Sequence, residues 1–508
     1  MKPPYPIDHR RYATGCLLLL FVVAVGLKLG VAIGNEPLNL DAVRYINAAR
    51  LVSQGQLLEA LAISQFMPLL PLLIWGVHLL LGDWVLSGQI VSALFLSLTI
   101  LPVFLLTRRL FDGKIAFWSA VACALSPSLT GYGAQILREP PFFFFLASAL
   151  YFAVRAFDRV RPGDFLLTGL FALLAASCRL EGLLFPVVCA GWILFLIWRN
   201  PERKTPLLRG AVLLGAPFLL LLAAATLGGV NLLRLDYVGS LSGQLFSAQG
   251  FRGFLDARQA LIELEQVLPG GQWANDFAAT ARNFLPLIYF LGLMKALLNV
   301  LYPPFAVLAA VGFWRRGKPG RGFSHLVAGV YLVTGGLFLL RMNFISDRYL
   351  LSAALPLFPF VGAGFQQILE KAGQGSRSLL PKALVVLFLL IPLGGSLRQI
   401  DAGDPSIRLA GEWLGGREFQ GDTLICNDER VPFYAGRWRG DYLQHPVRDF
   451  RRMGAIASEG GIDLMIVRIS ARQHRRVAAP EGYGRLRDFI GKKDAVLIFR
   501  RQQAAQEK

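Results

Sequence analysis

The stretch Leu17-Leu-Leu-Leu-Phe-Val-Val-Ala-Val25 carries no charge, and it lies within a mostly apolar segment over residues 13–33. Two further uncharged runs, 213–225 and 383–392, lie far along the 508-residue chain. A helix needs roughly 20 mostly apolar residues to cross the hydrocarbon core of a bilayer. Segments of this kind recur along the sequence, which predicts a chain that crosses a membrane several times.

Composition and charge indicate the same class of protein. Hydrophobic residues make up 54% of the chain and charged residues only 17%, whereas soluble proteins carry about 25% charged residues. The formal net charge is +19, and the Lys and Arg residues lie mainly in short loops between apolar segments. This distribution is typical of the cytoplasmic loops of membrane proteins, and it argues against a nucleic-acid partner.

Loop charges also predict the topology. His9, Arg10 and Arg11 precede a first apolar segment that is long for a secretory signal, so we expect an uncleaved helix and a cytoplasmic N-terminus. With the basic loops on one side, a first external loop covers 35–83 and a larger one covers 230–283. About eleven spans result: 13–33, 84–106, 115–130, 140–157, 164–177, 183–198, 207–229, one ending near Trp314, 323–340, 349–369 and 384–397.

Residues 68–82, inside the first external loop, are apolar but short and rich in proline. Fifteen residues barely cross a bilayer, and a span here would place Arg108 and Arg109 on the external side. We therefore expect a helix that lies along the membrane surface.

The composition changes at about Asp401. Charge becomes dense, and the short apolar runs 423–426, 464–467 and 495–499 alternate with helical stretches. The predicted fold is thus an all-α polytopic membrane bundle over 1–400, with about 11 transmembrane helices, and a small external, periplasmic α/β domain over 401–508.

Several polar residues stand at the external ends of apolar segments. The first group is Asn39-Leu-Asp41-Ala-Val-Arg44-Tyr45, in which Asp41, Tyr45 and Ala49 share one face of a helix. Asp41 is also a residue type that caps helix N-termini. A capping role and a catalytic role remain open at this position, and the two are compatible.

Three further groups are Gln135-Ile-Leu-Arg138-Glu139-Pro140-Pro141-Phe142, Cys178-Arg179-Leu-Glu181-Gly182, and Arg341 with Asp347-Arg348-Tyr349. Each has a purely structural alternative: an acidic helix N-terminus, an ion pair closing a tight hairpin, and interfacial anchors. A fifth group, 429–437 in the C-terminal domain, is typical of a solvated loop after a strand.

The first four groups all fall on one side of the membrane. They bring together carboxylates and guanidinium groups, which is the chemistry needed to transfer a group from an anionic, lipid-linked donor. One carboxylate can act as a general base on an acceptor hydroxyl, and arginines can bind a phosphate and stabilise its departure.

In this combination the chain resembles the GT-C superfamily of membrane glycosyltransferases, which includes protein O-mannosyltransferases and lipid A aminoarabinose transferases. The resemblance covers about residues 10–370. It rests on Asp41 with Tyr45 and Ala49, Pro68-Leu-Leu-Pro71-Leu-Leu-Ile-Trp75, Arg108-Arg109-Leu-Phe-Asp-Gly-Lys114, Arg138-Glu139-Pro140, Arg179-Leu-Glu181-Gly182 and Arg348-Tyr349.

The resemblance implies an inverting transfer from a polyprenyl-phosphate sugar donor. The family's catalytic aspartate corresponds to Asp41, and its second acidic residue corresponds to Glu139, where many relatives have Asp. Many relatives also have Lys-Gly where this chain has Arg179-Leu-Glu181-Gly182. The acid and cation functions are retained, but the substrate can differ.

On this interpretation Asp41 deprotonates the acceptor, and Glu139 orients the acceptor or supports Arg138. The donor phosphate binds Arg138, Arg179, Arg348 and Tyr349, with Tyr45 and Glu181 in support. We expect no cofactor, because neither acidic residue lies in an Asp-x-Asp motif that would indicate a divalent cation.

The expected partners are the lipid-linked donor, the bilayer and a glycan, lipid or protein acceptor. The expected location is a bacterial inner membrane. The alternative function is a lipid or solute transporter or flippase, but transporters tend to show repeats and charges near the membrane midplane. Here no repeat is evident, and the charged groups lie at one face.

Overall fold

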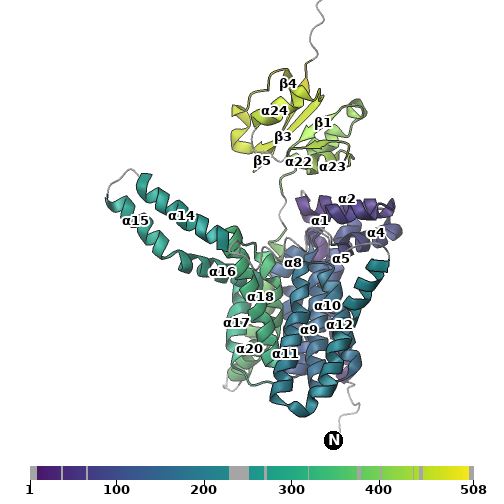
Figure 1. The fold of residues 1–508 in the computed structure, drawn as a ribbon, viewed down its shortest axis with the longest axis vertical. Helices are drawn as coiled ribbons and strands as arrows, with labels where there is room; N and C mark the ends of the chain where they lie inside the picture. Colours follow the sequence, from purple (N-terminus) through teal and green to yellow (C-terminus); the bar gives the residue numbers. More distant parts are fainter. Residues whose placement is uncertain are drawn as a thin grey trace, which may run out of the picture.

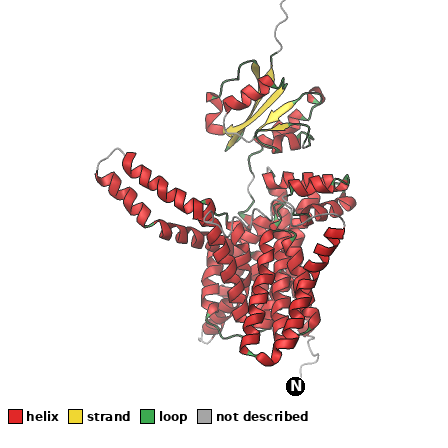
Figure 2. Cartoon of the chain, viewed as in Figure 1, coloured by secondary structure: helices red, strands yellow, loops and turns green. Residues whose placement is uncertain are grey.

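The computed structural model describes residues 9–35, 38–64, 67–227, 251–267, 272–318, 320–373, 379–400, 403–438, 440–445 and 450–502. Long helices pack side by side into a bundle, and a small domain containing a β-sheet lies beyond one end of it (Figure 1). The N-terminus lies at the opposite end. The strands are confined to the small domain, as Figure 2 shows.

Among the described helices, eight are long and apolar enough to cross a membrane, or nine if the bent pair α15–α16 counts as one span. The eight are α1 (His9–Gly34), α5–α6 (Trp84–Leu98 and Ile100–Leu110), α9 (Glu139–Arg159), η1–α11 (Leu180–Leu183 and Leu184–Arg199), η2–α12 (Pro201–Arg203 and Lys204–Leu227), α18 (Arg321–Met342), η5–α20 and α21 (Leu379–Leu397). The segment η5–α20 comprises η5 (Asp347–Leu350), α19 (Leu351–Ala354), η6 (Leu355–Leu357) and α20 (Phe358–Gly373).

The remaining expected spans are also helical but shorter. They are α7 (Gly113–Leu125), α10 (Pro162–Ala176) and α17 (Pro303–Phe313). Within the described residues each expected span therefore overlaps a helix, which confirms the all-α polytopic bundle. Eight or nine of these helices, and not about eleven, are long and apolar enough to cross a membrane. The short helix α8 (Pro127–Gly133) follows α7.

Two segments form the buried centre of the bundle. Each of these helices contains an apolar stretch of 18 residues. Of this stretch, 78% is buried inside the protein in α9 and 83% in the η5–α20 segment, whereas only 17% is buried in α12 and in α21. Outer helices must present apolar side chains to lipid, whereas central helices contact protein on all sides. The polar residues that open the two central segments, Glu139 and Arg348, are thereby brought to the same place.

The first external loop forms three helices, α2 (Leu40–Ser53), α3 (Leu57–Ile63) and α4 (Leu69–Leu81). Figure 1 shows α2 and α4 lying across the end of the bundle that faces the small domain. Leu70 and Ile74 of α4 pack with Ala42 and Ile46 of α2. The segment expected along the membrane surface is therefore the helix α4, which packs against α2; its position relative to the membrane stays a prediction.

The segment expected as the larger external loop is described only in part, because residues 228–250 and 268–271 lie outside the described residues. Helices α14 (Arg252–Val267) and α15 (Gln272–Asn283) form a hairpin that projects from the side of the bundle (Figure 1). An ion pair between Arg282 and Glu265, at 3.0 Å, joins the two helices. The chain then bends by 56° into α16 (Leu285–Leu301).

The C-terminal domain has a five-stranded sheet of order β2-β1-β3-β5-β4. Its strands are β1 (Leu424–Cys426), β2 (Leu443–Gln444), β3 (Leu464–Ser470), β4 (Tyr483–Ile490) and β5 (Asp494–Arg501), and its helices are α22 (Ser406–Leu414), α23 (Arg430–Tyr434) and α24 (Phe450–Glu459). Alternate residues of β3 enter two cores: Leu464 packs with α22, and Met465 packs with α24. The three predicted strands and the α/β character are confirmed.

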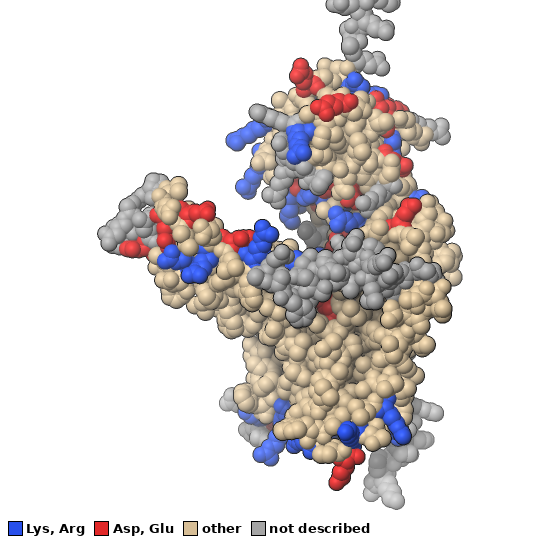
Figure 3. All heavy atoms as spheres, viewed as in Figure 1, with Lys and Arg blue, Asp and Glu red and all other residues tan. Residues whose placement is uncertain are grey.

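Basic side chains gather at the end of the bundle away from the C-terminal domain (Figure 3). There Arg109 pairs with Asp158 at 2.6 Å, and the Lys318 N–H donates to the Leu110 carbonyl at 2.8 Å. These contacts join the loops after α6, α9 and α17. The loops that we expected to be cytoplasmic therefore lie together at one end.

Candidate active site

Asp41 lies in the first turn of α2, but it does not cap this helix. The cap is Asn39, whose side chain accepts a hydrogen bond from the Ala42 N–H at 2.7 Å. The alternative in which Asp41 serves only as an N-cap is therefore wrong. Its carboxylate is instead directed at Arg348, whose Nη1 donates to Asp41 Oδ2 at 2.7 Å.

A second group of charges is buried beside the first. Arg179 donates to Glu139 and, through Nη2 and Nε, to both oxygens of Glu181 at 2.5 and 3.3 Å. The side chains of Arg179 and Glu139 are only 4% and 3% exposed, whereas Glu181 is 37% exposed. Gly182 allows the tight turn that presents this pair, because a Cβ there would meet the backbone of Ala176.

Arg348 links the two groups. Its Nε lies 3.8 Å from Glu139 Oε1, so Asp41, Arg348, Glu139, Arg179 and Glu181 form one continuous cluster. The cluster draws on α2, on the N-terminus of α9, on the α10–α11 turn and on η5. It therefore unites all four external groups of polar residues that the sequence indicated.

Two polar atoms in this cluster are buried without a hydrogen-bond partner among the described residues. They are Glu139 Oε2, an acceptor, and Arg348 Nε, a donor. Buried polar atoms are nearly always satisfied, so such exceptions call for an explanation. A ligand that both accepts and donates hydrogen bonds would satisfy the two atoms.

Two tyrosines flank the charged groups. The Tyr349 ring lies beside both guanidinium groups, with its centroid 5.1 Å from Arg179 Cζ and 5.5 Å from Arg348 Cζ. Tyr45 is buried one helical turn after Asp41, and burial raises its pKa to about 12 against the opposing charge of Arg138. Its hydroxyl therefore stays protonated near the site.

Two residues of the polar groups, Asn39 and Gln135, were given no role from the sequence but contribute to this site. Asn39 joins the first external loop to the next one, because its amide donates to Gln135 Oε1 at 3.3 Å. Gln135 in turn donates to the Gly131 carbonyl at 3.3 Å. The signal was present in part, since Asn is among the preferred N-cap residues, but Asp41 competed for that assignment.

The expectation of a solvated loop over 429–437 was wrong. Arg430 to Tyr434 form the short helix α23, and Glu429 and Arg430 are buried. The reason is tertiary: α23 packs against α2, which the local sequence does not reveal.

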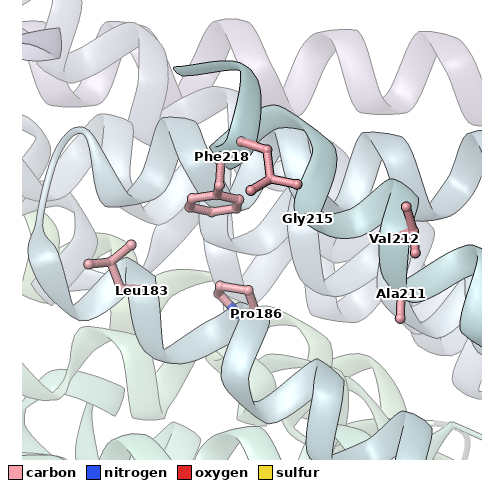
Figure 4. Close-up of a pocket in the computed structure, with 7 residues that line it drawn as sticks. Leu183, Pro186, Ala211, Val212, Gly215 and Phe218 are labelled. Carbon is pink, nitrogen blue, oxygen red and sulfur yellow. The ribbon is translucent and has the colours of Figure 1, made fainter. Parts of the chain in front are cut away.

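An apolar groove of about 570 Å³ lies between the η1–α11 segment and α12. Leu183, two residues after Glu181, lies at one end of it, and Figure 4 shows Leu183 and Pro186 facing side chains of α12. The remaining lining residues are Ala211, Val212, Gly215, Phe218 and Leu219. All seven are apolar, so the groove suits a hydrocarbon chain.

Residues 66–227 match the family model of dolichyl-phosphate-mannose-protein mannosyltransferases. The structure is similar to ArnT from Cupriavidus metallidurans in the apo state, at 12% identity and a TM-score of 0.56 over 96% of this chain and 98% of that chain. The chain has the GT-C fold. No curated protein matches the sequence.

Other structures with the GT-C fold carry lipid ligands. The fold is similar to ArnT from Cupriavidus metallidurans bound to undecaprenyl phosphate, at 13% identity and a TM-score of 0.55 over 96% of this chain and 98% of that chain. It is also similar to the oligosaccharyltransferase AglB from Archaeoglobus fulgidus in complex with an inhibitory peptide and a dolichol-phosphate, at 13% identity and a TM-score of 0.53 over 92% of this chain and 70% of that chain.

Among the described residues, no three His, Cys, Asp or Glu side chains are grouped so that they could hold a metal ion. The charges at the site are balanced by arginines instead, with Arg179 between Glu139 and Glu181 and with Arg348 on Asp41.

Proposed function

We propose that this protein transfers a sugar from a polyprenyl-phosphate donor to an acceptor hydroxyl at the external face of the membrane. The observation that carries this proposal is the pair Asp41–Arg348. Both side chains are partly exposed, at 31% and 28%, so an acidic and a cationic group are accessible at the surface end of the bundle. ArnT and AglB, with the same fold, have been seen with undecaprenyl phosphate and dolichol-phosphate, which supports a lipid-phosphate donor.

Arg348 is the residue best placed to bind the donor phosphate. Its Nε has no hydrogen-bond partner among the described residues, and guanidinium groups bind phosphate oxygens bidentately. Tyr349, whose ring lies beside the Arg348 guanidinium, and Arg138, which precedes Glu139, are proposed to bind the phosphate together with Arg348.

Arg179 has a different set of partners. It already binds Glu139 and both oxygens of Glu181, so it has little capacity left for a phosphate. We assign it the role of orienting Glu139, whose free Oε2 would accept a hydrogen bond from the acceptor.

The chemical step is a single displacement. Asp41 takes the proton of the acceptor hydroxyl, and the acceptor oxygen forms a bond to the anomeric carbon. The bond from that carbon to the phosphate oxygen breaks, and the electron pair leaves with the polyprenyl phosphate, which Arg348 stabilises. One displacement inverts the configuration of the anomeric carbon.

The lipid tail of the donor would occupy the apolar groove between α11 and α12. Burying a hydrocarbon chain there stabilises the complex by roughly 0.8 kcal/mol per CH₂ group removed from water, although part of this is lost when the chain leaves the bilayer. Leu183, which lines the groove, follows Glu181 by two residues in the sequence, so the proposal has the tail in the groove while the phosphate binds Arg348.

The proposed orientation places the N-terminus in the cytoplasm and the C-terminal domain in the periplasm of a bacterial inner membrane. It rests on the basic end of the bundle. Single cysteines test it in a Cys16→Ser background, because the other four cysteines are buried. An impermeant thiol reagent added to intact cells should label Gln54→Cys and not Arg199→Cys, and the opposite pattern would overturn the orientation.

The activity itself is tested with purified protein in lipid nanodiscs and a panel of undecaprenyl-phosphate-linked sugars. Mass spectrometry should detect free undecaprenyl phosphate and a glycosylated acceptor when membrane extract is supplied. In sealed vesicles, movement of the intact donor across the bilayer without cleavage would indicate the transporter alternative and contradict the proposal.

A further inference from the structure

The C-terminal domain contacts the loop that carries Asp41 through both backbone groups of one residue. The Leu38 N–H donates to the Tyr434 hydroxyl at 3.0 Å, and Arg430 Nη1 donates to the Leu38 carbonyl at 3.4 Å. Leu38 lies three residues before Asp41, next to the cap of α2. Both hydrogen bonds described for the Leu38 backbone are therefore made with side chains of α23.

Arg430 is itself held rigidly within the C-terminal domain. Its Nε and Nη2 donate to the two oxygens of Asp428 at 2.9 and 2.7 Å. Asp428 is buried and also accepts from Arg468 of β3 at 3.2 Å. A guanidinium that is bound in this way keeps its direction, so the sheet sets the position of the group that reaches Leu38.

The contact continues along α2. Glu429 Oε1 lies 3.8 Å from Arg44 Nη2. The Arg50 guanidinium stacks on the Trp438 ring, with Cζ 2.9 Å from the ring centroid. Phe433 and Trp438 also pack against the apolar cluster that contains Tyr45. Helix α2 is therefore held by α23 and its flanks from Leu38 to Arg50.

From this geometry we infer that Tyr434 and Arg430 are positioning residues for the reaction, acting through Leu38 on Asp41. This inference rests on the proposed function. The side-chain hydrogen bonds described for these two residues reach Leu38 and Asp428, and not the clustered charges of the site. Their effect arises because they hold the first turn of α2 against the bundle, where Asp41 meets Arg348.

The size of the effect follows from the geometry that proton transfer requires. A general base must lie about 2.6–3.2 Å from the atom that it deprotonates, and a displacement of about 1 Å can lower the rate roughly 100-fold. In the proposed function donor binding depends on Arg348 and the apolar groove, and no hydrogen bond or ion pair described for α23 reaches either of them. Loosening α2 should therefore lower kcat while the KM for the donor changes little.

The test compares two single-atom changes in the same domain. Tyr434→Phe removes the hydroxyl that accepts from Leu38, whereas Tyr483→Phe removes a hydroxyl that donates to the Ile462 carbonyl inside the domain. We expect Tyr434→Phe to lower kcat about tenfold without changing the donor KM, and Tyr483→Phe to retain kcat within twofold. Equal losses in both variants would mean that only the stability of the domain matters, and would overturn the inference.

Arg430 provides a second comparison. Arg430→Lys keeps a cationic donor near the Leu38 carbonyl and should retain more of kcat than Arg430→Gln. Equal activity of these two variants would contradict a role for Arg430 in holding Leu38.

A second readout does not depend on the assay for sugar transfer. A nitroxide attached to Gln54→Cys, at the end of α2, reports the mobility of this helix in nanodiscs. We expect a more mobile spectrum with Tyr434→Phe and an unchanged one with Tyr483→Phe. If Tyr434→Phe makes α2 mobile but the unmodified protein transfers no sugar, α23 does position α2 and the proposed function is wrong. If the spectrum of Tyr434→Phe is unchanged, α23 does not position α2 and the inference is wrong.

Discussion

Arg348 Nη1 donates a hydrogen bond to Asp41 Oδ2 at 2.7 Å, although 307 residues separate the two positions in the chain. The pair joins the group that we expect to bind phosphate to the group that we expect to accept a proton. Arg348 Nε has no hydrogen-bond partner among the described residues, so a donor phosphate could bind this nitrogen while Nη1 keeps its bond to Asp41. The leaving group and the base would then lie on the same guanidinium group.

Asp41→Asn should yield a well-expressed, folded and nearly inactive protein. The amide retains the size of the side chain and an acceptor for Arg348, but it cannot take a proton, and loss of a general base lowers rates about 10²–10⁴-fold. The measurement is the rate of sugar transfer normalised to the protein in the membrane.

The matched control for Asp41 is Asn39→Ser, which exchanges one good N-cap for another. This variant should retain most of its activity and stability. Activity of Asp41→Asn within a few-fold of the unmodified chain would remove Asp41 from the mechanism and make Glu139 the next candidate.

Arg348→Ala should weaken donor binding more than it slows the reaction at saturating donor. A hydrogen bond to a charged group contributes about 1.5–3 kcal/mol, so the donor Kd should rise by roughly 10–150-fold. Arg348→Lys keeps the charge but not the planar guanidinium group. Its donor Kd should therefore lie between those of the unmodified protein and of Arg348→Ala. Arg258→Ala, on the exposed hairpin helix α14, controls for loss of one positive charge; donor affinities of Arg348→Ala and Arg258→Ala that agree would contradict the assignment.

Glu139→Gln and Glu181→Gln should differ in their effect on stability. Removing one charge of a buried ion pair costs about 3 kcal/mol at the lower end of the usual range, and Glu139 is almost fully buried against Arg179. Glu181 is 37% exposed, so its substitution should cost about 1 kcal/mol or less. Thermal unfolding in detergent, followed by tryptophan fluorescence, measures the loss of stability in each variant. A loss in Glu181→Gln as large as that in Glu139→Gln would contradict the prediction.

Asp404 should make the stability of the C-terminal domain depend on pH. Burial disfavours its charge, but N–H groups of Asp494, Lys493 and Ser406 outweigh burial and hold the pKa of its carboxyl below the usual value. A lowered pKa in the folded state stabilises the domain above the unfolded pKa of about 3.9, and this stabilisation is lost as the pH falls.

Asp404→Asn should therefore lower the free energy of unfolding of the domain at neutral pH by about 2 kcal/mol, as expected for hydrogen bonds to a charged group. It should also flatten the decline in stability between pH 6 and 3. The measurement is chemical unfolding at pH 6 and at pH 3 of the unmodified protein and of Asp404→Asn. Asp488→Asn, at the exposed pair with Arg485, is the control. The same loss of stability between the two pH values in the unmodified protein and in Asp404→Asn would contradict the prediction.

Much of the fold and the membership of the site could be predicted from local sequence. The energetic penalty for charges in a bilayer confines Glu139, Arg179 and Arg348 to the ends of spans, so their positions and their common side follow from hydropathy. The strands of the C-terminal domain likewise follow from short apolar runs.

The pairing within the site could not be predicted in this way. Arg179 binds Glu139 and Glu181, and Arg348 binds Asp41, because two central segments bring their N-termini together. This depends on how helices pack over hundreds of residues, for which a short motif holds no information. The contact of α23 with Leu38 escaped prediction for the same reason, since a polar segment after a strand resembles an ordinary loop.

The hydrogen bond between Leu38 and Tyr434 spans 396 residues of chain, and this has a consequence for synthesis. A ribosome adding about 5–20 residues per second needs roughly 20–80 s to make that stretch. During this interval the segment before α2 has been made, but the partner that holds it does not yet exist. A nascent chain therefore cannot fix the first turn of α2, with Asp41, in its final place until the domain that carries Tyr434 has been synthesised and folded.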